Sequence, residues 1–169
     1  IAYVRIPRFS SNTSAKLTEV VTDFGERSGD LKGIVLDLRG NSGGLLEEAV
    51  KVVDLLVDDP GPPIVSQVSG GGRPGRKFPA TAGRLISCPA VVLVNRWSAS
   101  ASEVVAGALQ DFGRAEIVGT TTYGKGVSQQ RLEVPESVNR LVGGKASVQL
   151  ANFYLQLPSG RRFHGPRDS

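Results

Sequence analysis

The segment 97–103, which reads Trp-Ser-Ala-Ser-Ala-Ser-Glu, places three serines between an apolar run and a helical pattern. A serine at a helix start lies beside backbone N–H groups that have no acceptor within the helix. Those groups and the positive end of the helix dipole can stabilise a developing oxyanion, so each serine is a candidate nucleophile. Ser100 and Glu103 also fit a capping box, in which the serine only caps the helix. Spacing alone leaves Ser98, Ser100 and Ser102 open as nucleophiles and makes capping the simpler interpretation.

A second candidate is Lys125, which lies between Gly124 and Gly126. Flanking glycines let the backbone turn sharply and approach other elements closely. If such a lysine is buried, desolvation lowers its pKa, and the neutral amine can act as a general base. The alternative is an exposed lysine in a glycine turn. A phosphate-binding loop fits poorly, because Gly126 stands where the Walker pattern needs Ser or Thr.

The third candidate is the loop 40–44, Gly-Asn-Ser-Gly-Gly, between an expected strand and an expected helix. Free N–H groups at a helix start can hold a phosphate or an oxyanion. The same loop can equally be a plain connection between two elements.

Hydrophobic periodicity predicts alternating strands and helices, and therefore an α/β fold whose strand-rich C-terminal part favours a mixed sheet. The expected strands are 2–6, 34–38, 64–68, 90–94, 115–118, 127–134, 146–155 and 160–164. The expected helices are 45–57, 100–112 and one after Ser11 that carries Leu17, Val20, Val21 and Phe24 on one face. We expect 69–83 to be an exposed mobile loop and 135–144 to be a surface insertion. All three candidate motifs join a strand to the next element of the chain, where α/β sheets usually bind ligands.

Composition excludes several classes of protein. The 169 residues suffice for one domain with a core, and 40% hydrophobic with 21% charged residues excludes a disordered chain, a coiled coil and a disulfide scaffold. The single cysteine, Cys88, excludes an intrachain disulfide and a cysteine-rich metal site, and the single histidine, His164, is the one histidine that a Ser–His–Asp triad could use. A net charge of +4 without interleaved aromatic and basic residues indicates no nucleic-acid partner. No apolar run approaches the ~20 residues of a membrane span, and we expect no metal or cofactor.

Taken together, the three motifs are far more specific than any one of them. Asp-Leu-Arg-Gly-Asn-Ser-Gly-Gly at 37–44, Ser-Ala-Ser-Ala-Ser-Glu at 98–103 and Thr-Tyr-Gly-Lys-Gly at 122–126 occur in this order. They resemble the C-terminal processing peptidases, also called tail-specific proteases. The resemblance runs from Ala2 to about residue 165. The segments 94–103 and 147–149, together with Phe153-Tyr154, are most similar to the bacterial periplasmic branch.

This resemblance implies a fold related to Clp protease and crotonase, with a Ser–Lys dyad. The middle serine of the family motif corresponds to Ser100, the nucleophile, and the lysine of the glycine turn to Lys125, the base 25 residues later. A glutamine four residues after the lysine, here Gln129, assists it. The implied oxyanion hole is the N–H of Ala101 with that of Gly43 or Gly44, a choice that the motif leaves open.

The resemblance further implies a serine endopeptidase that cleaves proteins near an apolar C-terminus through an acyl-enzyme. It implies a periplasmic or other extracytoplasmic location in a bacterium, and a PDZ domain or adaptor in the full-length protein. We see no PDZ domain in residues 1–169, which we expect to form a single protease core. Two alternatives stay open: a non-catalytic relative that binds peptides or other ligands in the same cleft, and an acyl-transfer or enoyl-CoA enzyme on a crotonase-like scaffold.

Overall fold

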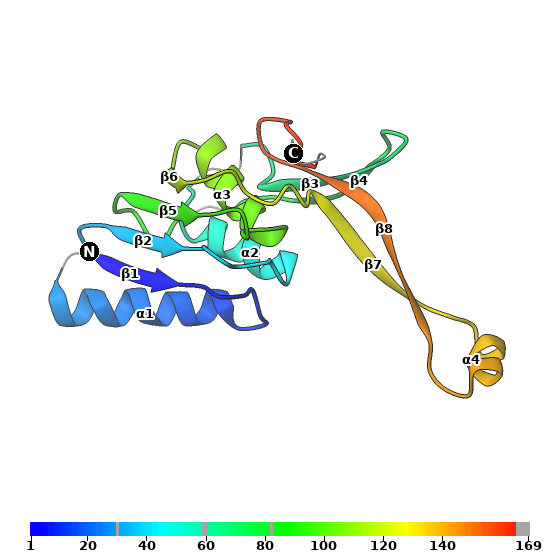
Figure 1. Ribbon diagram of the computed structural model, residues 1–169. Coiled ribbons are helices and arrows are strands. Elements are labelled where there is room, and N and C mark those ends of the chain that lie inside the picture. Colours follow the sequence, from blue (N-terminus) through cyan, green and yellow to red (C-terminus); the bar gives the residue numbers. More distant parts are fainter. Residues whose placement is uncertain (30, 59–60, 82, 165–169) are drawn as a thin grey trace.

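The computed structural model describes residues 1–29, 31–58, 61–81 and 83–164, and shows two sheets (Figure 1). The first sheet is parallel, with the order β1-β2-β5-β6. Its strands are β1 (Ala2–Arg5), β2 (Ile34–Asp37), β5 (Ala90–Val94) and β6 (Ala115–Gly119). Parallel neighbours need crossover connections. Helices α1 (Thr13–Ser28), α2 (Leu46–Asp54) and α3 (Ala101–Asp111) lie in these connections.

The second sheet is antiparallel, with the order β4-β3-β8-β7. Its strands are β3 (Val65–Ser69), β4 (Pro74–Phe78), β7 (Val127–Glu133) and β8 (Ser147–Gln156). Figure 1 shows the β7–β8 hairpin extending away from the body, with helix α4 (Glu136–Val142) at its tip. The start of β7 comes directly after the Lys125 turn, so this sheet positions that turn.

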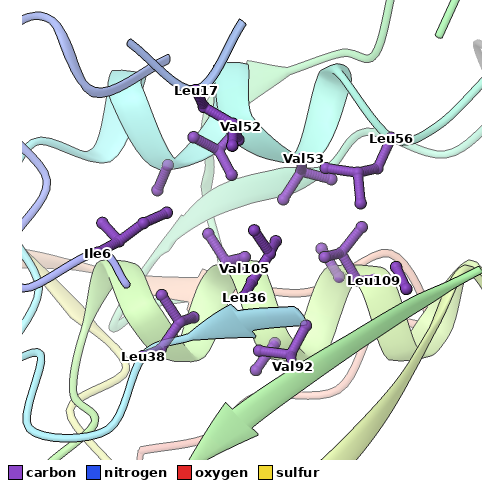
Figure 2. Close-up of a cluster of buried hydrophobic side chains, with 14 of the residues drawn as sticks. Ile6, Leu17, Leu36, Leu38, Val52, Val53, Leu56, Val92, Val105 and Leu109 are labelled. Atoms are coloured by element: carbon purple, nitrogen blue, oxygen red, sulfur yellow. The ribbon is translucent and has the colours of Figure 1, made fainter. Parts of the chain in front are cut away.

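Helix α3 is packed between two hydrophobic clusters, which fixes its N-terminus. The main cluster contains Val105 and Leu109 of α3 together with apolar residues of β2, β5, α1 and α2 (Figure 2). The smaller cluster contains the adjacent Val104, with Val65, Phe78 and Leu155 from the second sheet. Neighbouring residues of one helix therefore face different sheets. This arrangement brings the start of α3 to the place where the two sheets meet.

A buried carboxylate joins α1 to α2. Glu48 accepts hydrogen bonds from the Ser14 backbone N–H at 2.9 Å and the Ser14 hydroxyl at 2.8 Å, and pairs with Lys51 at 2.9 Å. Burial acts to raise the pKa of Glu48, but these hydrogen bonds to the ionised form outweigh it, so the net pKa is lowered.

The α/β class and the mixture of parallel and antiparallel strands are confirmed. Two expectations are wrong. Residues 69–83, which we expected to be a mobile loop, contain strand β4. A turn joins β4 to β3, and in this turn the Gly72 N–H donates to the Ser69 carbonyl at 2.9 Å. Residue 82 lies outside the described part. Residues 160–164 form no strand, only one isolated bridge between Gln156 and Arg162. The expected surface insertion at 135–144 contains α4, none of whose residues is buried.

Candidate active site

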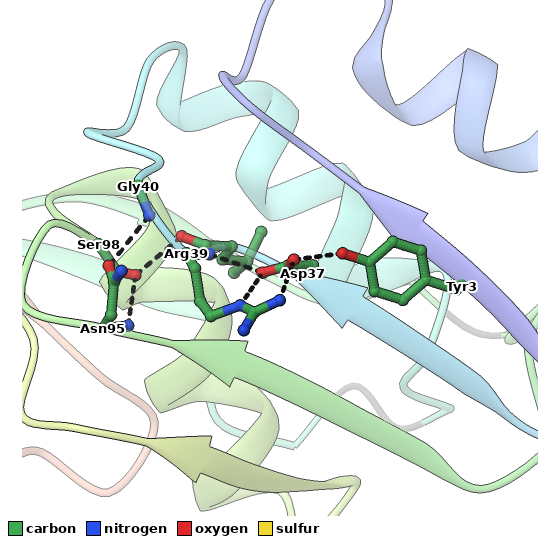
Figure 3. Close-up of polar contacts among 7 residues, drawn as sticks. Tyr3, Asp37, Arg39, Gly40, Asn95 and Ser98 are labelled. Carbon is green, nitrogen blue, oxygen red and sulfur yellow. Dashed lines mark hydrogen bonds and ion pairs between the residues drawn. The ribbon is translucent and has the colours of Figure 1, made fainter.

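The end of β2 is anchored by a polar cluster before the 40–44 loop begins (Figure 3). Asp37 accepts hydrogen bonds from Nε of Arg39 at 2.9 Å, from Nη2 of Arg39 at 2.8 Å and from the Tyr3 hydroxyl. The Arg39 guanidinium, aided by Tyr3, holds the pKa of Asp37 far below its usual range despite burial. The Oδ1 atom of Asn95 then accepts the Gly40 N–H at 3.0 Å. These contacts fix the direction in which the chain leaves the sheet.

Asn41 connects the 40–44 loop to the end of β1 and to the segment that enters α3, a role that no local signal in the sequence indicates. Its side chain is fully buried and donates to the Ile6 carbonyl at 2.8 Å, while its Oδ1 accepts the Gly43 N–H at 2.8 Å. Its carbonyl accepts the Ala99 N–H at 3.0 Å and the Ser102 hydroxyl at 2.9 Å. The loop therefore lies directly against the chain that enters α3.

The three serines left open by the sequence have different surroundings. Ser98 is buried, and its hydroxyl donates to the Leu38 carbonyl at 2.8 Å. Ser102 is also buried, with its hydroxyl on the carbonyl of Asn41. Of the three, Ser100 alone lines the open cleft. The hydroxyls of Ser98 and Ser102 thus bond the 37–44 segment to the start of α3 and the residues before it. Of the three serines, Ser100 is the one that a substrate can reach.

Ser100 has a strained backbone. Its φ of 56° makes it the one non-glycine residue with positive φ in the described part of the chain. Such conformations cost of order 1–3 kcal/mol and persist where the surroundings enforce them. Here the N–H of Ser100 donates to Oε2 of Glu103 at 2.8 Å, and the N–H of Glu103 donates to the Ser100 carbonyl at 2.9 Å. The bond from the Ser100 N–H to the Glu103 carboxylate is the glutamate half of the capping box expected from the sequence, and it helps to hold Ser100 in this strained geometry.

The buried Glu103 carboxylate also holds the Lys125 turn. Its Oε2 accepts the Lys125 N–H at 2.9 Å, and its Oε1 accepts the Gly124 N–H at 2.6 Å and the Thr122 hydroxyl at 2.8 Å. One side chain thus binds the backbone of Ser100 and the backbone of Lys125. From the sequence, helix capping and a hydrogen bond near Lys125 are alternative roles for Glu103, and the structure shows both.

Ser100, Lys125 and Gln129 line one open cleft of about 1150 Å³. Lys125 is half-buried and Gln129 is exposed at the start of β7. Among the described residues, no hydrogen bond joins the Ser100 hydroxyl to Nζ of Lys125. The two side chains therefore line the same cleft without a hydrogen bond between them in the described part of the chain.

The glycines of the 40–44 loop differ in what their N–H groups do. The Gly43 N–H donates to Asn41, whereas the N–H groups of Gly44 and Ala101 donate to no acceptor within the described residues. Gly44 lines the cleft, and its φ of 140° favours glycine. A Cβ on Gly44 would overlap the Phe9 carbonyl, and one on Gly43 would lie 2.9 Å from Cβ of Ser100. Both glycines are thus required where the loop passes the cleft.

The segment 157–164 supports the Lys125 turn from behind. A Cβ on Gly126 would lie 2.9 Å from the backbone nitrogen of His164. In the same segment, Nη2 of Arg161 pairs with Oδ1 of Asp111 in α3 at 2.8 Å. The segment therefore links the helix that begins after Ser100 to the turn that carries Lys125.

Within the described ranges, no three His, Cys, Asp or Glu side chains gather in a way that could hold a metal ion. None of the described helices is long and apolar enough to cross a membrane.

Comparison with known proteins gives consistent matches. The sequence model of Peptidase family S41 matches residues 1–167. The carboxy-terminal-processing protease of Bartonella bacilliformis is 38% identical over 168 residues, which are 98% of this chain and 36% of that protein. The carboxy-terminal processing protease CtpA of Bacillus subtilis is 38% identical over 133 residues, which are 79% of this chain and 28% of that protein.

A solved structure of a photosystem II D1 C-terminal processing protease has a TM-score of 0.80 and 35% identity over 96% of this chain, which corresponds to 39% of that chain. The chain spans about a third of the length of the curated relatives that it matches. The family model and these relatives confirm the family that the sequence motifs resemble. The chain belongs to Peptidase family S41.

Proposed function

We propose that the chain is the protease core of a serine endopeptidase that cleaves proteins near an apolar C-terminus. The observation that carries the proposal is that Ser100 and Lys125 line one cleft while the Glu103 carboxylate binds the backbone of both. A protein that only binds peptides has no need for a reachable serine and a lysine held in this way. This weighs against the non-catalytic alternative.

In the proposed reaction, Oγ of Ser100 attacks the carbonyl carbon of the scissile amide while Nζ of Lys125 acts as the general base and takes the hydroxyl proton. The tetrahedral intermediate collapses to an acyl-enzyme, and the proton passes from Lys125 to the leaving amine. A water molecule then attacks the ester and gives its proton to Lys125, which returns it to Ser100. Gln129 assists the lysine from the start of β7. Because both backbones are tied to Glu103, the approach of Nζ to Oγ is a side-chain movement of Lys125.

For the oxyanion we propose the N–H groups of Ala101 and Gly44. Both lack an acceptor among the described residues, and Gly44 lines the cleft. The N–H of Gly43, the other candidate from the motif, is engaged by Asn41 at 2.8 Å. Donors fixed before the reaction stabilise the developing charge without reorganisation, and one such donor is worth about 10²–10³ in kcat. Gly43 has the different role of allowing the loop to pass close to Ser100.

The substrate class is inferred from the walls of the cleft. Leu45, Trp97 and Tyr123 line it and expose between 40% and 53% of their surface. Apolar side chains of an unfolded protein segment can bury this surface. A packing role for Trp97 is the simpler expectation from sequence, and its exposure favours contact with substrate. We propose that residues 1–169 act as one protease core in a periplasmic or other extracytoplasmic setting, with a PDZ domain or adaptor of the full-length protein delivering the substrate.

The test is degradation of a fluorescently labelled, unfolded protein that ends in apolar residues. Wild type is compared with Ser100→Ala, with Lys125→Ala, and with Ser137→Ala as a matched control, since Ser137 is an exposed serine of α4 that does not line the cleft. We expect the first two variants to lose at least about a thousandfold in rate, because a dyad acts as a unit, and Ser137→Ala to keep the wild-type rate. Cleavage that persists in Ser100→Ala would exclude this nucleophile. Binding of the protein by wild type without cleavage would favour the non-catalytic relative.

A further inference from the structure

Arg8 lies at the edge of the cleft on a fixed backbone. It comes after Pro7, whose ring restricts the chain, and precedes Phe9, which is 1% exposed. The Phe9 N–H donates to the Gly43 carbonyl at 3.0 Å, and the Leu45 N–H donates to the Phe9 carbonyl at 2.9 Å. While Phe9 is anchored in the core, Arg8 itself is exposed and lines the cleft. Arg8 is therefore held at the cleft by a rigid stretch of backbone.

The charges around the cleft leave Arg8 uncompensated. The charged residues that line the cleft are Arg8, Glu47 and Lys125. Oε1 of Glu47 pairs with Nη1 of Arg76 at 3.3 Å. Arg8 has no hydrogen-bond or ion-pair partner among the described residues. A guanidinium is always ionised, and its planar fork of donors matches the two oxygens of a carboxylate.

The position of Arg8 also limits where such a carboxylate would lie. Phe9, the next residue, forms a bridge with Gly44, whose N–H we propose as an oxyanion donor. An extended arginine side chain reaches roughly 7 Å, which is about two residues of extended peptide. A carboxylate bound by Arg8 would thus lie within about three residues of the scissile bond.

We propose that Arg8 is a specificity-determining residue that binds a carboxylate of the substrate close to the scissile bond. The free α-carboxylate of the substrate's C-terminus is one source, and an Asp or Glu side chain is the other. The inference deepens the proposed function and rests on it for the nature of the ligand as a peptide. It predicts that the core itself, without any flanking domain, favours peptides that carry a carboxylate within about three residues of the scissile bond.

The experiment measures binding in the Ser100→Ala background, so that it does not depend on turnover. The probes are three fluorescein-labelled octapeptides of alanine and leucine: one with a free C-terminal carboxylate, one with a C-terminal amide, and one amidated peptide with glutamate as the third residue from its end. Fluorescence anisotropy gives their affinities for the Ser100→Ala parent protein and for the Arg8→Gln variant in the same background. Arg5→Gln is the matched control, because Arg5 is an exposed arginine three residues earlier that does not line the cleft.

We expect Arg8→Gln to weaken binding of the carboxylate peptide about tenfold and binding of the amide peptide less than twofold. We expect Arg5→Gln to bind both peptides with affinities close to those of the parent protein. Recovery of tight, Arg8-dependent binding by the glutamate peptide would mean that Arg8 accepts a side-chain carboxylate, and its absence would restrict recognition to the C-terminus. Equal affinity for acid and amide peptides would overturn the proposal. So would equal losses in Arg8→Gln and Arg5→Gln, or no binding of any probe. If only the catalytic proposal fails, wild type will not cleave the test protein, but the difference in affinity between the acid and amide peptides will remain.

Discussion

Replacing Glu103 with glutamine removes a charge that holds both halves of the proposed dyad. Each carboxylate oxygen accepts two hydrogen bonds: Oε2 from the N–H groups of Ser100 and Lys125, and Oε1 from Gly124 and Thr122. Glutamine has one oxygen and one NH₂ group, which donates. Whichever way the amide is oriented, its NH₂ group faces two donors, so two hydrogen bonds are lost.

The magnitude depends on those two bonds. A hydrogen bond to a charged group contributes about 1.5–3 kcal/mol, so their loss corresponds to about 3–6 kcal/mol, divided between global stability and the geometry of the cleft. If about 3 kcal/mol falls on the transition state, kcat/KM decreases more than a hundredfold, since about 1.36 kcal/mol is a factor of ten. We expect Glu103→Gln to lower the free energy of unfolding by at least about 2 kcal/mol and to lower kcat far more than it raises KM.

The assay combines urea unfolding with peptide hydrolysis at temperatures where the variant remains folded. Glu116→Gln is the matched control, because Glu116 is an exposed residue of β6 outside the cleft, and it should change both quantities very little. The proposed role of Glu103 is refuted if Glu103→Gln behaves like Glu116→Gln. A large loss of stability with unchanged kcat in the folded fraction would show that Glu103 supports the fold and does not position the dyad.

Three further predictions concern the loop, the Lys125 turn and the α1–α2 contact. Gly44→Ala should cost several kcal/mol of stability or prevent folding, because its Cβ would overlap the Phe9 carbonyl; a variant with a wild-type melting curve would contradict this. Gly126→Ala should displace the Lys125 turn away from the 157–164 segment and lower kcat at least tenfold with little change in KM. An unaltered kcat would show that contact with the 157–164 segment does not position the Lys125 turn. Glu48→Gln should destabilise the protein at pH 7 and progressively less as the pH falls below about 4.5. The folded-state pKa of Glu48 is lowered, so its contribution is present above the unfolded value and is lost as the pH falls through the folded one. Urea titrations of both proteins at pH 7 and at acidic pH check this, and a difference that grows on acidification would contradict it.

Much of the site is predictable because its signals are local. A serine with a glutamate three residues later marks the start of α3, and glycines mark the loop before α2 and the turn around Lys125. Two further roles depend on partners that lie far away in the sequence. Asn41 binds Ile6 and Ser102, which are 35 and 61 residues away, and Glu103 reaches Lys125 across 22 residues. Only the folded chain brings these groups together.

The two errors in the fold have the same origin. Strand β4 reads Pro-Gly-Arg-Lys-Phe, which lacks the apolar alternation of a half-buried strand, so its composition predicts a loop. It becomes a strand because β3 offers it an edge to pair with. Residues 160–164 carry an apolar residue among basic ones and resemble a strand, but the chain turns at Gly160, whose φ is 87°, and Arg161 instead pairs with Asp111 of α3.

Covalent trapping of the nucleophile tests the central claim most directly. A serine-directed phosphonylating probe is incubated with wild type, Ser100→Ala and Lys125→Ala, and the adduct is measured by intact mass and located by peptide mapping. We predict one adduct, on Ser100, that forms at least about a hundredfold more slowly in Lys125→Ala and is absent from Ser100→Ala. An adduct on another serine, or an unchanged rate in Lys125→Ala, would contradict the Ser100–Lys125 dyad.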